Sequence, residues 1–324
     1  MKILITGVHG FVGSNLVKYL APANEIYGLD IVAPEKEGVI KTYSWDDLDA
    51  GRVPAVDAIV HLAGKAHDTK NQAAAEVYFK VNTGLTQNMF DYFLAHSDIR
   101  KFVFFSTAKA AADKVEGVLT EEVVPAPVGP YGESKIAAEK YILEKFKDYS
   151  LKFKDSSEID SDKAKSVYIF RPCMIHGPGN KGNLNLLYNV VRKGIPWPLG
   201  AFENRRTFTS VENICFAVNG VLTKDVPSGI YNMGDDEALS TNELIEEICK
   251  SLGRKAHIWH LPKGMMNGVA KVGGWLHLPL NSERLRKLTE NYISSNAKIK
   301  KALGVERMPV VAREGLKVTL ESFK

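Results

Sequence analysis

The chain has 324 residues, of which 45% are hydrophobic and 25% are charged, with 42 Lys and Arg against 38 Asp and Glu. This composition excludes a globally disordered chain, a collagen and a coiled coil, and the 3 Cys exclude a disulfide scaffold. The formal net charge of +4 is small for this length and gives no reason to expect nucleic acid as a partner.

The cysteines and the first residues indicate the compartment. Cys173, Cys215 and Cys249 lie far apart without CxxC spacing, so we expect neither a metal site nor disulfides, and a reducing environment fits best. The chain enters a strand-like run at once, without a signal peptide. The longest candidate for membrane contact, Met265 to Leu280, is too short to span and is interrupted by Lys271 and glycines. We therefore expect a cytoplasmic protein with no membrane span.

The first half of the chain alternates short aliphatic runs with longer helical patterns. Buried strands are expected at 2–6, 25–29, 58–62, 101–106 and 167–170, and helices at 11–20, 73–96 and 131–147. Strands that alternate with helices predict right-handed crossovers and an α/β fold with a doubly wound parallel sheet. In such a sheet, ligands bind at the carboxyl ends of the strands.

The pattern changes after Arg171, where loops lengthen and Gly and Pro become frequent. We expect residues 1–171 to form one domain and residues 172–324 to form mainly a smaller lobe, with some segments returning to the first domain. Within that lobe, Ser240 to Leu252 is predicted to be a helix capped by Ser240. Residues 145–165 carry many charges of both signs and are expected to form a solvated extension.

A glycine-rich turn follows the first predicted strand. Gly7, Gly10 and Gly13 permit a tight turn, a close approach of backbone to a pyrophosphate, and close packing of helix on sheet. Asp30 ends the second predicted strand, 23 positions after Gly7. A carboxylate there can accept hydrogen bonds from both ribose hydroxyls of an adenosine and would repel a 2′-phosphate, which favours NAD over NADP.

A second pattern suggests redox chemistry on a sugar. Tyr131 and Lys135 are four residues apart, so they share one face of the predicted helix. A phenol has a pKa of about 10, and a nearby ammonium and a nicotinamide cation would stabilise the phenolate. The tyrosine could then exchange a proton with a sugar hydroxyl or carbonyl while hydride moves. Thr107, at the end of the strand before this helix, could bind the same oxygen.

These features together resemble the extended short-chain dehydrogenase/reductase family, which contains the sugar-nucleotide epimerases and dehydratases. The matching segments are 6–13, Asp30, 61–64, 81–82, 106–107, 130–135, 171–172 and 177–179. Within the family, segments 177–183, 198–200 and 204–206 most resemble UDP-hexose 4-epimerases and UDP-N-acetylquinovosamine-type 4-ketoreductases.

The resemblance implies a Rossmann-type sheet, bound NAD, a UDP-hexose or UDP-N-acetylhexosamine substrate, and roles for particular residues. Tyr131 would be the acid/base, Lys135 would hold the nicotinamide ribose, and Thr107 would bind the reacting oxygen with Ser106 behind it. The cofactor would be held by Gly7, Gly10, Phe11, Val12, Gly13, Asp30, Leu62, Ala63, Asn82, Ser106, Tyr131, Lys135 and Pro172. The substrate would be held by Thr107, Asn183, Leu199, Arg206 and Arg284, the two arginines at its diphosphate. His61 would be structural.

The sequence departs from the family pattern at three places. Dehydratases follow the catalytic threonine with Asp-Glu, whereas Ala108 and Lys109 stand here, which argues against dehydration. Met174 replaces an asparagine found in many epimerases, and residues 110–113 lack a common Tyr-Gly pair.

Three functions remain open on the sequence alone. The first is a 4-epimerase that keeps its NAD. The second is a 4-ketoreductase that makes a UDP-6-deoxy-N-acetylhexosamine and releases its cofactor. The third is a non-catalytic NAD-binding regulator, which would not need Tyr131 and Lys135. The family often forms homodimers through two helices per subunit, here 83–96 and 131–147, so a homodimer is an expectation by analogy.

Overall fold

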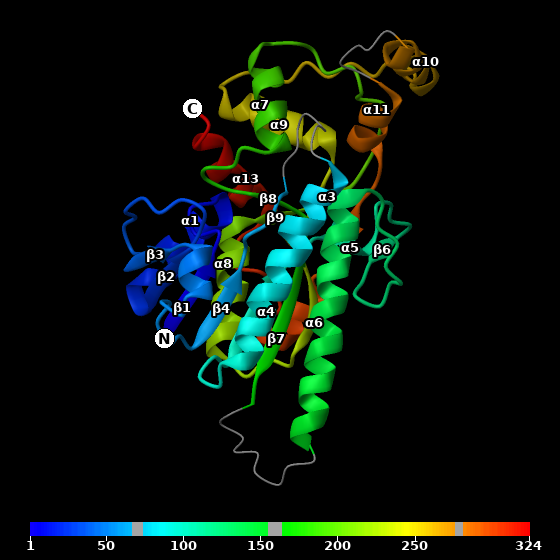
Figure 1. Cartoon of the computed structure of the whole chain (residues 1–324). Helices are drawn as coiled ribbons and strands as arrows, with labels where there is room; N and C mark the ends of the chain where they lie inside the picture. Colours follow the sequence, from blue (N-terminus) through cyan, green and yellow to red (C-terminus); the bar gives the residue numbers. More distant parts are fainter. Residues whose placement is uncertain (67–73, 155–163, 276–280) are drawn as a thin grey trace.

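A computed structural model of the chain describes residues 1–66, 74–154, 164–275 and 281–324. At its centre lies a seven-stranded sheet in which all neighbouring strands pair in parallel (Figure 1). The order across this sheet is β10 (Gly229–Met233), β7 (Ser166–Pro172), β5 (Lys101–Phe105), β4 (Ala58–His61), β1 (Lys2–Thr6), β2 (Glu25–Leu29) and β3 (Lys41–Tyr43). The predicted doubly wound parallel sheet is confirmed.

Helices cover both faces of the sheet. Ile3 and Ile5 of β1 face one apolar core, while Leu4 between them faces the other. Strands buried on both sides need apolar residues at every position, which explains the continuous aliphatic runs in the sequence. One face is covered by α1 (Phe11–Leu20), α8 (Val211–Thr223) and α12 (Ala297–Leu303), the other by α2 (Trp45–Asp49), α4 (Leu85–Ala95) and α6 (Pro130–Lys154).

The direction of winding changes beside β1. From β1 the chain continues to β2 and β3 on one side, and later to β4, β5 and β7 on the other. The loops that follow β1 and β4 therefore diverge and leave a crevice at the carboxyl ends of these strands. This crevice is where the glycine turn lies.

A second group of elements stands above this crevice (Figure 1). A three-stranded sheet has the order β11 (Ala238–Leu239), β9 (Arg206–Ser210), β8 (Met174–His176). An apolar cluster joins it to α7 (Asn183–Arg192), α9 (Thr241–Ser251) and α13 (Ala312–Glu321), and a smaller cluster joins α10 (Lys263–Trp275) to α11 (Ser282–Thr289). The remaining elements are η1 (Ala21–Ala23), α5 (Ala108–Ala111), and the parallel pair β6 (Val118–Leu119) and β12 (Ile293–Ser294).

Several helix boundaries differ from the sequence predictions. The predicted helix 73–96 begins outside the described residues, and its described part is divided into α3 (Ala75–Tyr78), a π-helical turn η2 (Phe79–Gly84) and α4. Helix α6 continues to Lys154 instead of ending at 147, so the charged segment starts as helix, while residues 155–163 lie outside the described part. The capped helix after Ser240 is confirmed, because Ser240 and Glu243 form a reciprocal capping box. Among the described helices, none is long and apolar enough to cross a bilayer.

Candidate active site

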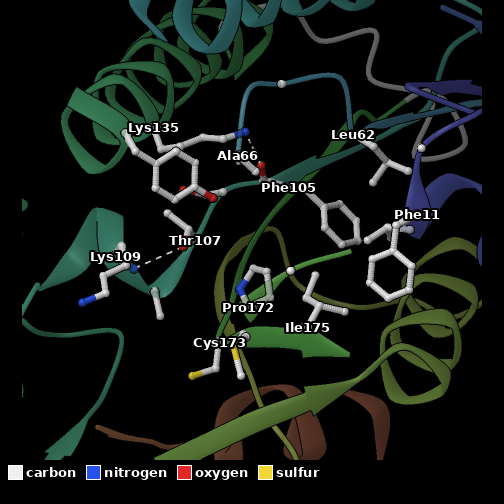
Figure 2. Close-up of a pocket in the computed structure, with 18 of the residues that line it drawn as sticks. Phe11, Leu62, Ala66, Phe105, Thr107, Lys109, Lys135, Pro172, Cys173 and Ile175 are labelled. Atoms are coloured by element: carbon white, nitrogen blue, oxygen red, sulfur yellow. Dashed lines mark hydrogen bonds between the residues drawn. The ribbon is translucent and has the colours of Figure 1, made fainter. Parts of the chain in front are cut away.

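A cavity of about 840 Å³ lies at the carboxyl ends of β1, β4, β5 and β7. Figure 2 shows Thr107 and Lys135 toward one end of this cavity and Phe11 toward the other. Its walls come from both groups of elements, because the glycine turn and α6 face β9 and the start of α7 across it. A cavity of this size between a parallel sheet and a second lobe is typical of an active site.

Most of the residues predicted from the sequence meet at this cavity. Those that line it are Gly7, Gly10, Phe11, Val12, Gly13, Leu62, Ser106, Thr107, Tyr131, Lys135, Pro172, Asn183 and Arg206. Five predicted residues are not among its lining: Asp30, Ala63, Asn82, Leu199 and Arg284.

The turn after β1 requires glycine because a side chain there would collide with neighbouring backbone. Gly7 has a φ of +68°, and a Cβ on it would lie 3.1 Å from the backbone nitrogen of Ala63. A Cβ on Gly13 would lie 2.5 Å from the carbonyl oxygen of Gly7. Helix α1 begins at Phe11 with its first N–H groups toward this turn, so backbone donors and the positive end of the helix are available to phosphates.

Asp30 lies directly after β2, beside the glycine turn rather than in the wall of the cavity. Its Oδ2 accepts the N–H of His9 at 3.0 Å and its Oδ1 accepts the N–H of Ile31 at 2.8 Å. These bonds fix the carboxylate, and each oxygen keeps a further lone pair for a ribose hydroxyl.

A buried chain of hydrogen bonds fixes the loop after β4. The Thr6 hydroxyl accepts the N–H groups of Leu62 and Ala63, so its own proton must go to Nδ1 of His61, 2.7 Å away. The Thr86 hydroxyl donates to the carbonyl of Asn82 and therefore accepts from Nε2 of His61 at 3.0 Å. Burial lowers the pKa of His61 to about 3, which agrees with a neutral ring protonated on Nε2. His61 thus holds a loop, as predicted, and Ala63 is tied to Thr6.

Asn82 acts from behind the wall of the cavity. Its Oδ1 accepts the N–H of Lys65 at 2.7 Å, and its Nδ2 donates to the carbonyl of Lys65 and to the Ser134 hydroxyl. The side chain is fully buried, and all its bonds are made within the protein. It lies in the π-helical turn η2, a local irregularity that is frequent at functional sites. Asn82 thus links the loop after β4 to helix α6, and its contact with the cofactor stays a prediction.

Tyr131 lies in the first turn of α6 and shares a hydrogen bond with Thr107. Thr107 is also the N-cap of α5, where its hydroxyl accepts the N–H of Lys109 at 3.3 Å (Figure 2). Burial raises the pKa of Tyr131, and the bond from Thr107 opposes this only in part. Desolvation of the phenolate thus outweighs the effect of the neighbouring protein groups, and the stabilisation expected from a nicotinamide cation stays a prediction.

Lys135 lies one helical turn beyond Tyr131, and its side chain is buried. Its Nζ donates to the carbonyl of Phe105 at 2.8 Å and lies 4.9 Å from the ring centroid of Phe104. Burial lowers the pKa of Lys135 to about 8, although the carboxylate of Glu139 opposes the shift. The ammonium stands beside Gly64, where a Cβ would come within 3.1 Å of Nζ, so the glycine allows the loop to pass close to it.

A buried ion pair lies beside Ser106, behind the predicted site residues Thr107 and Lys135. Nε of Arg171 donates to both carboxylate oxygens of Glu139, at 3.0 and 3.1 Å, and Nη2 donates to Oε2. The Ser106 hydroxyl donates to Oε1 of the same carboxylate. Ser106 therefore stands behind Thr107, as predicted, with its hydroxyl turned to Glu139. Two strands and one helix that carry the site, β5, β7 and α6, are joined at this point.

The opposite wall of the cavity comes from the second lobe. Arg206, the first residue of β9, lines it and donates from Nη1 to the carbonyl of Lys287. Asn183 begins α7 and also lines it. In contrast, Leu199 is buried in the apolar cluster with α10 and α11, and Arg284 is exposed in the first turn of α11. The structure thus brings only one of the two predicted arginines to the cavity.

Some cavity residues were not found from the sequence. Tyr292 contributes a wall, and its hydroxyl donates to the carbonyl of Ala112. Lys109 lies nearby, with Nζ 2.8 Å from Oδ1 of Asp113 and 5.0 Å from the centroid of the Tyr292 ring. Tyr292 stands far along the chain in a short strand-like segment, and no local pattern marks such a residue. The remaining unpredicted lining includes Phe105, Cys173, Ile175, Asn180, Thr207 and Phe208.

Comparisons with known proteins agree with this geometry. The model of the NAD dependent epimerase/dehydratase family matches residues 3–234, well over half of the chain. The chain belongs to this family. The predicted family and its dependence on NAD are confirmed.

Two relatives cover 99% and 76% of this chain. A UDP-glucose 4-epimerase of Vibrio cholerae is 29% identical over 99% of this chain and 95% of its own. A GDP-6-deoxy-D-mannose reductase of Pseudomonas aeruginosa is 25% identical over 76% of this chain and 78% of its own. The fold also matches a solved UDP-glucuronic acid 4-epimerase from Bacillus cereus in complex with NAD, at a TM-score of 0.73 and 20% identity over 100% of this chain and 98% of the other.

Within this family, the residues after Thr107 argue against dehydration. Elimination of water needs an additional acid and base, and Ala108 offers neither. The Lys109 ammonium is held by Asp113, which is itself 3.4 Å from Nη1 of Arg286. The Lys109 ammonium and the Asp113 carboxylate therefore pair with each other, and neither acts as an acid or base at the Thr107 hydroxyl.

Proposed function

We propose that this protein is a 4-epimerase of a UDP-hexose that retains its NAD. One observation carries the proposal: the Tyr131–Thr107 pair lies in a single cavity between a glycine turn that fits a dinucleotide and an arginine that can hold a diphosphate. The Vibrio cholerae relative, a UDP-glucose 4-epimerase, supports this choice because it aligns over nearly the whole chain.

The proposed roles follow from the contacts. Tyr131 takes the proton of the C4 hydroxyl and later returns it, and Thr107 holds the same oxygen. Bound NAD supplies reversible hydride exchange at that carbon. Lys135 is held beside the loop after β4 and binds the nicotinamide ribose, where its charge favours the phenolate. Proton transfer by such a positioned side chain accelerates a reaction by about 10²- to 10⁴-fold.

Arg206 and Asn183 hold the nucleotide end of the substrate. A guanidinium presents paired donors that match the oxygens of a diphosphate, and its attachment to the Lys287 carbonyl fixes its direction. Anchoring the diphosphate leaves the hexose free to present either face to the Tyr131 end of the cavity, which is what inversion at C4 needs.

The division of the chain follows from these roles. We propose that residues 1–171 hold NAD and the catalytic side chains, and that residues 172–324 mainly hold the sugar nucleotide. β10, α8 and α12 are the segments that return to the first domain. We also propose a cytoplasmic homodimer in which α4 and α6 form the contact.

The test is to denature the purified protein and assay the NAD that is released, then to incubate native protein with UDP-glucose and with UDP-N-acetylglucosamine. Retained NAD and conversion to the galacto forms are expected. An empty protein that oxidises NADH only with a 4-keto sugar would establish the ketoreductase instead. NAD binding without turnover of any of these sugars would favour the regulator.

A further inference from the structure

Helix α10 (Lys263–Trp275) presents apolar side chains to solvent. Met265, Val269, Val272 and Trp275 are 47%, 49%, 54% and 80% exposed. Their spacings of four, three and three residues place them within one stripe along the helix. In Figure 1, α10 lies at the periphery of the second group of elements, away from the seven-stranded sheet.

This stripe is not part of the core of the protein. The opposite side of α10 carries Met266 and Ala270, which are 4% and 0% exposed and pack in a cluster with Leu199 and Leu285. The helix therefore packs on the protein through one side, and the exposed stripe makes no contact in the apolar clusters. Single exposed apolar residues are common, but an aligned set that ends in a nearly fully exposed tryptophan usually marks a contact surface.

The charge around this helix is mainly positive, because α11, which packs against it, carries Arg284, Arg286 and Lys287 beside the single acidic residue Glu283. Residues 248–275 contain no Asp or Glu, and they contain Lys250, Arg254, Lys255, Lys263 and Lys271. These 28 residues thus carry a formal charge of +5, whereas the whole chain carries +4. Lys263 and Lys271 belong to α10 itself and are exposed.

We propose that α10 docks the protein on the surface of an anionic lipid bilayer. Its apolar stripe would enter the boundary between headgroups and acyl chains, Trp275 would anchor one end, and Lys271, which flanks the stripe, would meet the negative headgroups. The charge decides between this and other occupants, because a second copy of the chain would bring two positive faces together. Thirteen residues of helix span about 20 Å, which suits a helix that lies flat on a bilayer and is too short to cross it.

The test measures co-sedimentation of the full-length protein with large vesicles of phosphatidylcholine containing 30% phosphatidylglycerol. We expect binding that weakens at high salt and is much lower on phosphatidylcholine alone. Lys271→Glu should weaken binding by at least about fivefold, and Val272→Asp by more than tenfold. Trp275→Phe should remove a blue shift of tryptophan fluorescence on addition of vesicles.

The matched control is Val124→Asp, which places the same charge at a residue that is 84% exposed in the loop before α6. It should bind vesicles like the wild type, and all variants should keep the wild-type midpoint of thermal unfolding. The proposal is overturned if the wild type does not sediment with anionic vesicles, or if Val124→Asp weakens binding as much as Val272→Asp. It is also overturned if Val272→Asp only dissociates an oligomer, with vesicle binding unchanged.

Discussion

Tyr131 and Thr107 are the two side chains on which the proposed chemistry depends. Removing the phenol oxygen with Tyr131→Phe leaves the glycine turn and Lys135 in place, so the variant should still retain NAD. Turnover should fall by about 10²- to 10⁴-fold, because the proton of the sugar hydroxyl then has no acceptor. The measurement is the rate of UDP-hexose interconversion, together with the NAD content per chain.

The matched control for this prediction is Tyr141→Phe. Tyr141 lies in the same helix, and its hydroxyl donates to Asp91 at 2.7 Å rather than facing the cavity. Its loss should leave turnover unchanged. A Tyr131→Phe enzyme that works within tenfold of the wild type would contradict the role of the phenol as acid/base.

Arg206 tests the substrate end in the same way. Arg206→Ala should raise the KM for the UDP-sugar roughly 100-fold, since charge-assisted bonds to a diphosphate contribute about 1.5–3 kcal/mol each, while NAD content should not change. Arg205→Ala is the control, because that neighbouring guanidinium contacts Glu243 and the Ala238 carbonyl instead of the cavity. Equal effects of both substitutions on KM would show that Arg206 does not hold the substrate.

At the scale of secondary-structure elements, helix α6 connects the proposed catalytic residues to the core. Tyr131, Lys135 and Glu139 succeed one another at intervals of four residues along it, and Glu139 binds Arg171 of β7 and Ser106 after β5. Nη1 of Arg171 has no partner among the described residues, so the guanidinium depends on this one carboxylate. The position of the helix against these strands therefore rests on a buried charge pair.

Glu139→Gln should accordingly destabilise the protein by about 3–5 kcal/mol, because it leaves the Arg171 charge buried without a counter-charge. Urea unfolding followed by circular dichroism measures this change. Glu144→Gln removes a charge from an exposed position of the same helix and should change stability by less than about 0.5 kcal/mol. If the two variants unfold at the same urea concentration, the ion pair does not hold the element in place.

The sequence predicted these elements where local pattern and burial agree. The helix at 11–20 and the strands at 2–6 and 25–29 have the predicted bounds, since apolar residues recur at helical spacing in the first and dominate the two strands. The π-helical turn at Phe79–Gly84 was not predictable, because it depends on the bonds of Asn82 to Lys65 and Ser134. Strands of two or three residues, such as β6, were also not predicted from the sequence, because their pairing partners are distant in the chain.

At the scale of the whole molecule, the same division holds for the candidate site. The meeting of the glycine turn and Thr107 was predictable because each follows a strand, and the carboxyl ends of parallel strands meet, while Tyr131 and Lys135 were marked by their spacing of four residues at the start of a helix. Residues such as Tyr292 and Phe208 reach the cavity only because the second lobe folds over it. Leu199 and Arg284 lie outside the lining of the cavity, one buried against α10 and the other exposed on α11, and their contacts with the substrate stay predictions.

The pH dependence of global stability offers a test of the buried Lys135 ammonium. Its pKa is about 8 in the folded protein, and 10.5 is the ordinary value. Between these values the unfolded chain binds a proton that the folded protein does not, so this group makes the free energy of unfolding rise with pH. Below about pH 8, Lys135 is protonated in both the folded and the unfolded chain, and burial of its charge lowers the free energy of unfolding in full. The rise can reach about 3 kcal/mol by pH 10.5.

Buried thiols and phenols act in the opposite direction at high pH, since burial raises the pKa of Cys173 and Cys215 to about 12. The measured quantity is therefore the difference in unfolding free energy between the wild type and Lys135→Met, from urea titrations at pH 7 to 10. This difference should shift in favour of the wild type as pH rises from 8.

The control is Lys165→Met, at a second buried lysine whose pKa is about 8. Its stability should shift with pH in a similar way. The variant should keep its activity, because Lys165 binds backbone carbonyls away from the cavity. A difference that stays constant with pH would mean that Lys135 keeps its ordinary pKa in the folded protein.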